Sequence, residues 1–380
     1  MERRKFIGAA GLAGILAAGM APAVQAGQAI RWRLASRFPK IQDIPHGGIQ
    51  TLIRMVKDIS GGKFEISLQE ADEQTSSAGV LDSVQNGNVE CGHTSAVYYV
   101  GKDEAFALDG AIPFGLNARQ MTAWMQQGNG LTLLREFYMG YGIINFPMGN
   151  TGAQMGGWYR KPVKSLADLK GLRMRITGLG SQVFERIGGK PSNLPSGEII
   201  KAFERGNIDA AEWVGPYDDS KLGLHKVCKN YAYPGWWEGS SQFSLYVNHR
   251  AYDALTEENQ AILEAATAVA HLDIQAQYDA RNPLAMKELL AGKVTLTTLP
   301  SAVLDAAYKT AQDLYAELSG KNPQWRKIYG SYAAFLRNQG WNWGFGELGF
   351  GNYMHERQQK AIAAQQSELS RKKSAPAGRR

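Results

Sequence analysis

Hydrophobic and polar residues alternate in two different ways along the first part of the chain. Ile30, Trp32 and Leu34 alternate with charged residues, which predicts a half-buried strand. Residues 46–59 instead carry their apolar side chains at helical spacing, and a pair of glycines ends that helix before a second alternating strand over residues 64–68. A strand, a helix and a strand in this order are typical of the start of an α/β lobe.

The same periodicities predict the remaining helices and strands. A helix of about 30 residues begins after Thr256, which suits an N-cap, and contains Pro283. The aromatic, glycine-rich stretch 341–353 is interpreted as packing. The other predictions are a helix over 80–87, a strand over 89–93 that brings Tyr98 and Tyr99 to a strand end, one helix over 117–138, a strand over 141–147, a helix over 197–205, a strand over 293–298 and a helix capped by Ser301.

Chain length and the order of these elements predict two lobes joined by a hinge. About 340 residues remain once both ends of the chain are set aside, more than one hydrophobic core usually serves. We assign residues 29–148 to lobe 1, which chain after about residue 240 completes, and residues 149–239 to lobe 2. Residues 240–355 are shared, and their long helix is expected to brace both lobes. A cleft between lobes suits a ligand that is enclosed and later released.

Residues 1–26 resemble a cleavable export signal. Arg3, Arg4 and Lys5 precede an apolar stretch that is shorter than the roughly 20 residues a bilayer span needs. The arginine pair followed by Phe6 favours the twin-arginine route, but the flanking residues depart from its usual pattern, so ordinary Sec export stays open. Either route predicts a periplasmic protein.

The formal net charge of +7 is no evidence for nucleic-acid binding. The export signal contributes +2 and the last ten residues contribute +5, so the part between them is neutral. Residues 366–380 are interpreted as a basic disordered tail. Cys91 and Cys228 fall in different lobes, and a disulfide between them would lock lobes that must open. Both are therefore expected to be free thiols.

Residues 208–219, IDAAEWVGPYDD, place one carboxylate in apolar surroundings. Glu212 follows small and apolar residues, precedes Trp213, and the stretch breaks soon after at a Gly-Pro pair, as a strand ending at a cleft does. A carboxylate in such a place is costly unless it pairs with a cation or is protonated. Glu212 therefore indicates either a bound metal ion or a structural salt bridge, and this stretch alone leaves both open.

Two further stretches add polar groups suited to the same cleft. The segment GNTGAQMGGW supplies amide oxygens from Asn150 and Gln154 among four glycines, although a turn is its plainer interpretation. In KGLRMRI, Arg173 and Arg175 alternate with apolar residues and share one strand face. An arginine at a strand end can hold a carboxylate with two parallel hydrogen bonds, although surface arginines are commoner.

These stretches, together with YPGWWEG at residues 233–239, resemble the substrate-binding proteins of TRAP transporters. The similarity extends from about Trp32 to about Tyr353 and is most specific in the middle third of the chain. It is closest to the branch that binds 2-oxo acids such as pyruvate, or lactate, together with a cation. The resemblance implies an α/β fold of the two-lobed periplasmic-binding-protein kind, type II-like. One departure is Glu70–Gln74, where family members often carry a Pro-Ala-Gly-Glu-Leu-like loop, which would alter ligand size or cation preference on that wall.

The resemblance also implies roles for individual residues. Arg175 corresponds to the arginine that anchors the ligand carboxylate, Gln154 and Glu212 correspond to cation ligands, and the residue at Trp213 adds its backbone carbonyl. Oxygen ligands favour Na⁺ or Ca²⁺ over zinc or copper. The remaining candidates are Glu238, as a further cation ligand that would favour Ca²⁺, and Asn150, Tyr98 and Tyr99 as ligand contacts, with packing at the edge of the core as the alternative for the tyrosines.

The function implied is that of an extracytoplasmic solute receptor. It would bind a small 2-oxo or 2-hydroxy monocarboxylate without turnover and deliver it to a TRAP membrane permease. Some members of this branch dimerise through C-terminal helices, so a homodimer is left open. The alternatives are an exported enzyme acting on small organic acids and a receptor for another transporter class. Against an enzyme, the six histidines are scattered and the sequence has no HExxH, GxSxG or phosphate loop. The sequence does not determine which acid or which cation is bound.

Overall fold

The computed structural model describes residues 29–69 and 79–374 of the chain. The predicted export signal, the divergent loop Glu70–Gln74 and residues 375–380 of the predicted tail lie outside these ranges. A search of the described helices finds no segment with the length and apolar character of a membrane span.

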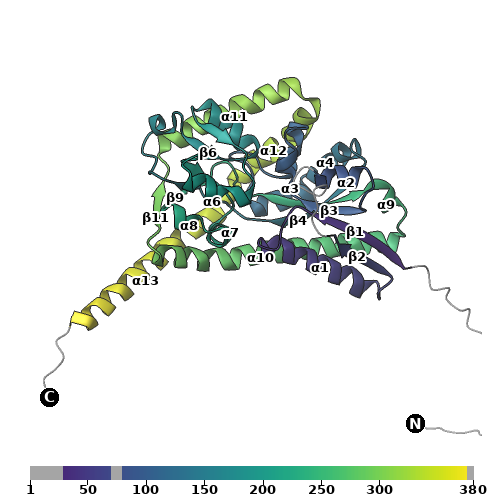
Figure 1. Ribbon diagram of the computed structural model, residues 1–380, viewed down its shortest axis with the longest axis horizontal. Coiled ribbons are helices and arrows are strands. Elements are labelled where there is room, and N and C mark those ends of the chain that lie inside the picture. The colour runs from purple at the N-terminus through teal and green to yellow at the C-terminus, as the bar shows by residue number, and fades with distance from the viewer. Residues whose placement is uncertain (1–28, 70–78, 375–380) are drawn as a thin grey trace, which may run out of the picture.

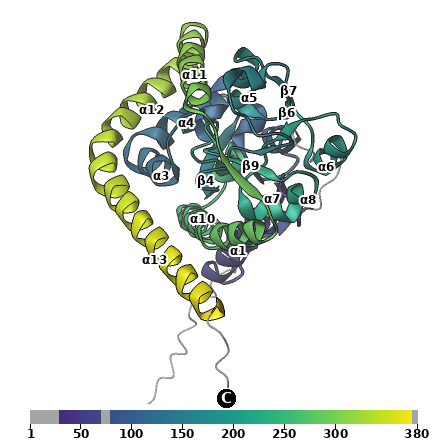
Figure 2. The same ribbon diagram turned by 90° about the vertical axis from the view of Figure 1, so that its left-hand side faces the viewer.

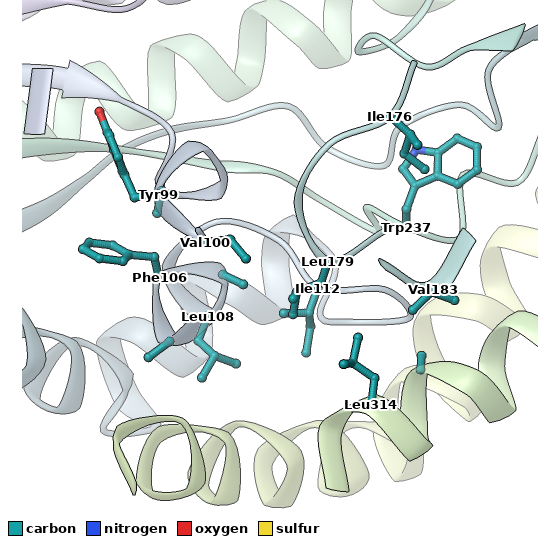
Figure 3. Close-up of a cluster of buried hydrophobic side chains, with 14 of the residues drawn as sticks. Tyr99, Val100, Phe106, Leu108, Ile112, Ile176, Leu179, Val183, Trp237 and Leu314 are labelled. Atoms are coloured by element: carbon teal, nitrogen blue, oxygen red, sulfur yellow. The ribbon is translucent and has the colours of Figure 1, made fainter. Parts of the chain in front are cut away.

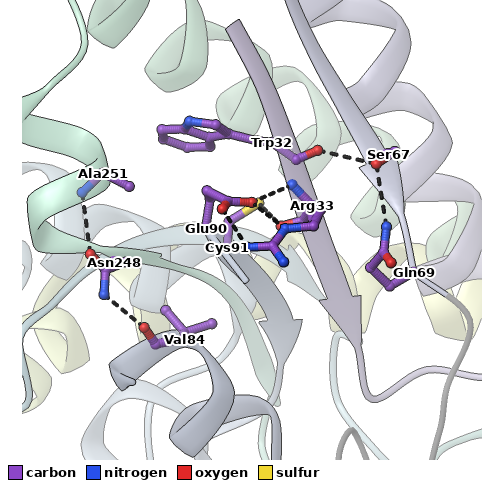
Figure 4. Close-up of polar contacts among 9 residues, drawn as sticks. All are labelled: Trp32, Arg33, Ser67, Gln69, Val84, Glu90, Cys91, Asn248 and Ala251. Carbon is purple, nitrogen blue, oxygen red and sulfur yellow. Dashed lines mark hydrogen bonds and ion pairs between the residues drawn. The ribbon is translucent and has the colours of Figure 1, made fainter. Parts of the chain in front are cut away.

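The first sheet has five strands in the order β2-β1-β3-β10-β4. Strand β1 pairs in parallel with β2 and β3, whereas β10 runs antiparallel to β3 and β4. Polar contacts join β1 to the chain on either side of it: Arg33 Nη2 donates to Glu90 Oε1 at 2.7 Å and the Ser67 hydroxyl donates to the Trp32 carbonyl at 3.2 Å (Figure 4). The strands are β1 Ile30–Ser36, β2 Phe64–Leu68, β3 Cys91–Thr94, β4 Ile143–Asn150 and β10 Gln242–Asn248.

Helices cover both faces of this first sheet. Apolar residues of α1 and α10 pack with Trp32 and Leu34 on one face, and those of α2 pack with Ala35 and Tyr246 on the other. The bounds are α1 Asp43–Ile59, α2 Gly79–Gln85 and α10 Glu257–Ala291. Strand β10 comes from chain beyond residue 240, so a later part of the chain contributes to this sheet.

The second sheet has six short strands in the order β11-β9-β5-β8-β6-β7. Strand β6 lies between β7 and β8 and pairs in parallel with both, which aligns Arg175 with Ser192 and Ala211. The strands are β5 Trp158–Tyr159, β6 Arg173–Arg175, β7 Lys190–Ser192, β8 Ala210–Ala211, β9 Asn230–Tyr233 and β11 Thr295–Thr298, and the helices of this part are α5 Gly178–Arg186, α6 Ser196–Glu204, α7 Pro216–Leu222 and α8 Leu224–Val227.

Helix α10 spans 35 residues and contacts both parts of the molecule (Figure 1). The Thr256 hydroxyl caps it by accepting from the Asn259 backbone N–H. Its first half packs on α1 and β4, and its second half packs on α7. The expected long brace is therefore present. The exact lobe boundaries drawn from the sequence stay a prediction.

A large hydrophobic core is shared between the two parts of the molecule (Figure 3). Tyr99 and Phe106, from the turns η2 Ala96–Tyr99 and η3 Glu104–Asp109, belong to the same cluster as Leu179 and Val183 of α5. Leu314 of α11 Ser301–Lys321 closes it from the C-terminal side. Both predicted free thiols are present, and Cys91 and Cys228 are buried.

The structure corrects three local predictions. Residues 117–138 form two helices, α3 Ala118–Gln127 and α4 Gly130–Met139, because Asn129 adopts a left-handed conformation with φ 67°. A Cβ atom on Gly130 would lie 2.6 Å from the Trp124 ring, so the break lets the chain pass close to that side chain. Tyr98 and Tyr99 occupy the single turn η2 and not a strand end. Helix α11 begins at Ser301 itself, with Pro300 as its N-cap.

The C-terminal helices also differ from prediction. Helix α12 (Pro323–Asn342) continues through the π-helical turn η5 (Trp343–Glu347) into α13 (Leu348–Ser374), which extends along the outside of the molecule (Figure 2). Residues 366–374 are thus helical where a disordered tail was predicted. Trp341, Phe345 and Phe350 are 76%, 81% and 69% exposed, so the predicted packing of 341–353 is wrong within one chain. Aromatic composition indicates burial, but it does not say which chain supplies the cover.

Candidate functional site

A cavity lies where the two sheets approach each other, and we call it the interlobe cavity. Tyr98 of η2 and Phe243 of β10 line it from the first part of the molecule, and Arg175, Glu212 and Glu238 line it from the second. Its free volume is about 30 Å³, enough for water but little more. A larger molecule can enter only when side chains or lobes move apart.

Arg175 is held at the end of β6 by several acceptors. Its Nη1 donates to the Glu212 carbonyl at 3.0 Å and also to the Glu212 carboxylate, and its Nε donates to the Leu194 carbonyl at 3.2 Å. The guanidinium carbon lies 5.1 Å from the centroid of the Trp213 ring. The side chains of Arg175 and Glu212 are 4% and 3% exposed. The pair is therefore almost fully desolvated, which is costly for both ions.

The two carboxylates in the cavity wall are both destabilised as anions. Burial, reinforced by the negative charge of Glu212, raises the pKa of Glu238 to about 8. Burial also raises the pKa of Glu212, and the charge of Arg175 opposes that rise. A cation beside them would favour the ionised form of both side chains.

Gln154 reaches the cavity from the loop that follows β4. Its Oε1 is buried and has no hydrogen-bond partner among the residues that the structure describes. Its backbone N–H donates to the Glu238 carbonyl at 3.1 Å, so Gln154 and Glu238 are neighbours in the cavity wall. An orphaned buried amide oxygen is costly, and a hard cation is the kind of partner it suits.

Glycines hold these two loops together. A Cβ on Gly235 would lie 2.5 Å from the Gln154 carbonyl, and a Cβ on Gly156 would lie 2.9 Å from the Pro234 carbonyl. Both motifs, GNTGAQMGGW and YPGWWEG, therefore need glycine where their backbones touch. This close contact between the two loops places Gln154 next to Glu238.

The interlobe cavity brings together most of the residues singled out from the sequence. Arg175, Gln154, Glu212, Trp213, Glu238 and Tyr98 all line it. Tyr99 does not: it lies in the core, with its hydroxyl 3.0 Å from the Thr94 hydroxyl, so the predicted ligand contact is corrected for this tyrosine. Asn150 is also outside the lining. Its Oδ1 accepts from the Gly152 N–H at 2.9 Å, so it shapes the loop behind the wall.

Sequence reasoning missed several lining residues. Thr177 directs its hydroxyl toward the Glu212 carboxylate at 3.5 Å, and its position two residues after Arg175 was a usable signal. Phe38 and Phe243 form an aromatic wall with ring centroids 4.6 Å apart. They come from distant segments without a recognisable motif, so only the fold reveals them.

Within the described ranges, no three His, Cys, Asp or Glu side chains gather as they would around a transition metal. The side-chain oxygens that line the cavity instead come from two carboxylates, amides and hydroxyls. This donor set fits Na⁺ or Ca²⁺, which bind oxygen ligands including carbonyls and amides.

The sequence matches a known family of proteins. The family model described as bacterial extracellular solute-binding protein, family 7 (DctP) matches residues 36–322. The chain belongs to this family. The resemblance to TRAP substrate-binding proteins is thereby confirmed, and the family and its relatives are binding proteins of transporters.

Individual relatives of this solute-binding protein are similar over most of their length. The monocarboxylate 2-oxoacid-binding periplasmic protein of Nostoc sp. is 45% identical over 332 residues, which is 87% of this chain and 91% of the relative. A TRAP transporter solute-binding protein from Bordetella bronchiseptica, a mixed-occupancy dimer with calcium and picolinate in its active site, gives a TM-score of 0.84 at 44% identity and covers 88% of this chain and 99% of that chain. One from Pseudoalteromonas atlantica with bound sodium and pyruvate gives 0.80 at 36% identity, covering 85% and 99%. The predicted two-lobed α/β fold is confirmed.

Proposed function

We propose that this solute-binding protein binds a small 2-oxo or 2-hydroxy monocarboxylate together with Ca²⁺ or Na⁺. Pyruvate, lactate and longer 2-oxo acids are the candidate ligands. The observation that carries the proposal is the buried Arg175 guanidinium beside two buried carboxylates and the orphaned Gln154 Oε1. With Na⁺ the site would receive one negative and one positive charge. With Ca²⁺ the additional positive charge would be balanced by ionisation of Glu238, whose pKa burial raises to about 8.

Arg175 would hold the acid by its carboxylate. Its planar fork can donate two parallel hydrogen bonds, one of which replaces the present bond to the Glu212 carboxylate. Glu212 would then turn to the cation, with Gln154 Oε1, Glu238 and the Trp213 carbonyl as the other protein oxygens. The cation supplies positive charge for these oxygens and for the keto or hydroxyl oxygen of the acid. Two carboxylates in the set favour Ca²⁺.

The small volume of the interlobe cavity supports a binding cycle with opening and closing. Because the side chains around the interlobe cavity leave little free space, we infer that the lobes part to admit an organic acid and close around it. Closing excludes water, which strengthens the contact between Arg175 and the acid. We infer binding without turnover, followed by delivery to a TRAP membrane permease.

The test is calorimetric titration of chelator-treated protein with pyruvate, lactate and longer 2-oxo acids, with Ca²⁺, with Na⁺ and with neither. One-to-one binding that requires a cation, with the acid recovered unchanged by NMR, is the expected result. Recovery of a chemically altered acid would revive the enzyme interpretation. Failure of all these acids under every cation condition would overturn the proposed ligand class.

We also propose that the exposed aromatic stretch 341–353 is covered by a second copy of the chain. Trp341, Phe345, Phe350 and Tyr353 form an apolar surface that monomers rarely leave bare. The Bordetella bronchiseptica relative is described as a dimer. Sedimentation equilibrium should show a dimer that a Trp341→Ser/Phe345→Ser/Phe350→Ser variant converts to monomer. A wild-type monomer at all accessible concentrations would exclude this cover.

Export to the periplasm completes the proposed function. The route is decided by an Arg3→Lys/Arg4→Lys variant, which keeps the charge of the signal. We expect it to abolish export, as measured by cell fractionation, since the twin-arginine pathway reads the arginine pair itself. Normal export of the variant would point to Sec.

A further inference from the structure

One peptide group at the crossing between the lobes is held from both sides by histidines. His93 Nε2 lies 2.8 Å from the Met148 carbonyl oxygen, and the Gly149 N–H donates to His271 Nδ1 at 2.9 Å. That carbonyl and that N–H belong to the same peptide bond. It lies near the end of β4, directly before the loop that carries Gln154 to the interlobe cavity.

The two histidines come from different supports. His93 belongs to β3 in the first sheet, and His271 belongs to the bracing helix α10 (Figure 1). The His93 ring lies beside the two aromatic residues that line the interlobe cavity, 4.9 Å from the Phe38 ring centroid and 6.1 Å from that of Phe243. The first sheet and helix α10 therefore both hold the Met148–Gly149 peptide. His93 also lies next to the aromatic residues that line the interlobe cavity.

The hydrogen bonds dictate the protonation of both rings. Since a carbonyl can only accept, His93 must carry its proton on Nε2, and since the Gly149 N–H donates, His271 Nδ1 must be unprotonated. His271 Nε2, 3.4 Å from the Thr122 hydroxyl, then carries the remaining proton. Burial lowers the pKa of each ring to about 4, which keeps both neutral at physiological pH.

Gly149 adopts a backbone conformation and a close approach that a side chain would not tolerate. Its φ is 131°, and a Cβ there would lie 2.9 Å from Ile274 and 3.0 Å from Phe243. The direction of the chain at Gly149 also affects the loop that follows. In this loop the Thr151 N–H donates to the Ser241 carbonyl at 3.0 Å, and Gln154 lies three residues further on. A rotated peptide would move the amide away from Arg175 and Glu212.

We infer that His93 and His271 are positioning residues for ligand binding, holding the Met148–Gly149 peptide so that the Gln154 loop meets Arg175 and Glu212. This inference rests on the proposed function. It differs from simple stabilisation, because a purely structural histidine would lower the melting temperature without changing the affinity of the protein that remains folded.

Matched variants separate these roles. His93→Gln keeps a donor near Nε2 and His271→Asn keeps an acceptor near Nδ1, whereas His93→Leu and His271→Leu remove the bonds while keeping the bulk. We expect each leucine variant to bind the acid about tenfold more weakly, the equivalent of one lost hydrogen bond, and each amide variant to stay near the wild-type affinity. Wild-type affinity in both leucine variants, or equal losses in the leucine and amide variants, would overturn the inference.

A spectroscopic measurement covers the case in which a leucine variant does not fold. In the ¹⁵N-labelled wild-type protein, a coupling across the hydrogen bond between the Gly149 amide nitrogen and His271 Nδ1 is expected, with slow exchange of that amide. Rapid exchange of the Gly149 amide together with no coupling would refute the hydrogen bond to His271, and with it the inference. Absence of acid binding by the wild-type protein would instead count against the proposed function, while this measurement still decides whether the peptide is held.

Discussion

Two arginines of one three-residue strand meet their carboxylates under opposite conditions. Arg173 and Arg175 both lie on β6, and each pairs with an acidic residue close to β8, Asp209 or Glu212. Arg173 donates from Nε and Nη2 to both oxygens of Asp209, at 2.9 and 2.8 Å. Its side chain is 46% exposed, whereas that of Arg175 is 4% exposed.

The difference in burial distinguishes the ion pair that we propose as functional from the one at the surface. An exposed pair contributes little to stability because water and salt screen it. A buried pair costs more desolvation than it returns, so its presence needs another explanation than stability alone. At Arg175 the explanation that we propose is an exchange of partners: the guanidinium would leave the Glu212 carboxylate for the carboxylate of the bound acid.

The largest expected effect comes from removing the buried guanidinium. Arg175→Ala should weaken binding of the acid by about 100-fold or more, because truncating one partner of a buried charged pair costs about 2–5 kcal/mol. Calorimetry on the folded variant measures it. Arg173→Ala is the matched control, with an expected change of less than about twofold because its partner is at the surface. Equal effects of the two substitutions would contradict the assignment of Arg175.

A smaller effect is expected from the carboxylate on the buried side. Glu212→Gln keeps the shape but removes one charge from the proposed cation ligands, so the affinity for Ca²⁺ should fall by about tenfold, and higher Ca²⁺ should partly restore binding of the acid. Titrations of the acid at several Ca²⁺ concentrations test this, with Asp209→Asn as the control. An unchanged dependence on Ca²⁺ would remove Glu212 from the cation site.

The contrast between these arginines was only half visible in the sequence. Alternation in KGLRMRI placed both on one strand face, but it gave them the same environment, because exposure depends on which residues of β8 and of neighbouring loops approach each side chain. The family resemblance, and not the periodicity, selected Arg175 and with it Gln154 and Glu212. Adjacent tyrosines show the same limit: the turn η2 sends Tyr98 to the cavity and Tyr99 to the core.

The helices and strands were likewise predictable only where local periodicity decides the structure. Strands β1 and β2 of the first sheet and helix α1 were predictable because strand and helix periods alternate cleanly from residue 30 to residue 68, whereas no strand was predicted for β10. The division of residues 117–138 into α3 and α4 falls at Gly128-Asn129-Gly130, a local turn signal that the helical periodicity on both sides obscured. Burial of residues 341–353 cannot be read from one chain when, as we propose, a second copy covers them.

A buried carboxylate without a cationic partner tests what burial alone does. Asp218 of α7 accepts from the Tyr278 hydroxyl at 2.8 Å, and burial raises its pKa to about 7 despite that bond. The folded protein therefore holds a proton here that the unfolded chain has lost above pH 4, so this contribution to stability is complete at low pH and disappears as the pH rises through about 7.

Replacing this carboxylate should remove that pH dependence. We expect Asp218→Asn to raise the free energy of unfolding at pH 8 by roughly 1–3 kcal/mol, with the gain vanishing near pH 4. Urea unfolding at pH 4, 6 and 8, without acid or cation, measures it. Loss of stability at pH 8 would show that the side chain is ionised there and held by its surroundings.

The smallest effect belongs to the exposed pair and has the opposite sign. Hydrogen bonds from Arg173 lower the pKa of Asp209, so its contribution is present at neutral pH and lost as the pH falls through that lowered value. Asp209→Asn should therefore reduce the free energy of unfolding at pH 7 by less than about 1 kcal/mol, and the reduction should shrink in acid and in high salt. The same urea experiment measures it. An equal loss of stability from Asp209→Asn and from breaking the buried Arg175–Glu212 pair would show that exposure does not separate the two arginines. Burial would then not identify Arg175 as the functional arginine.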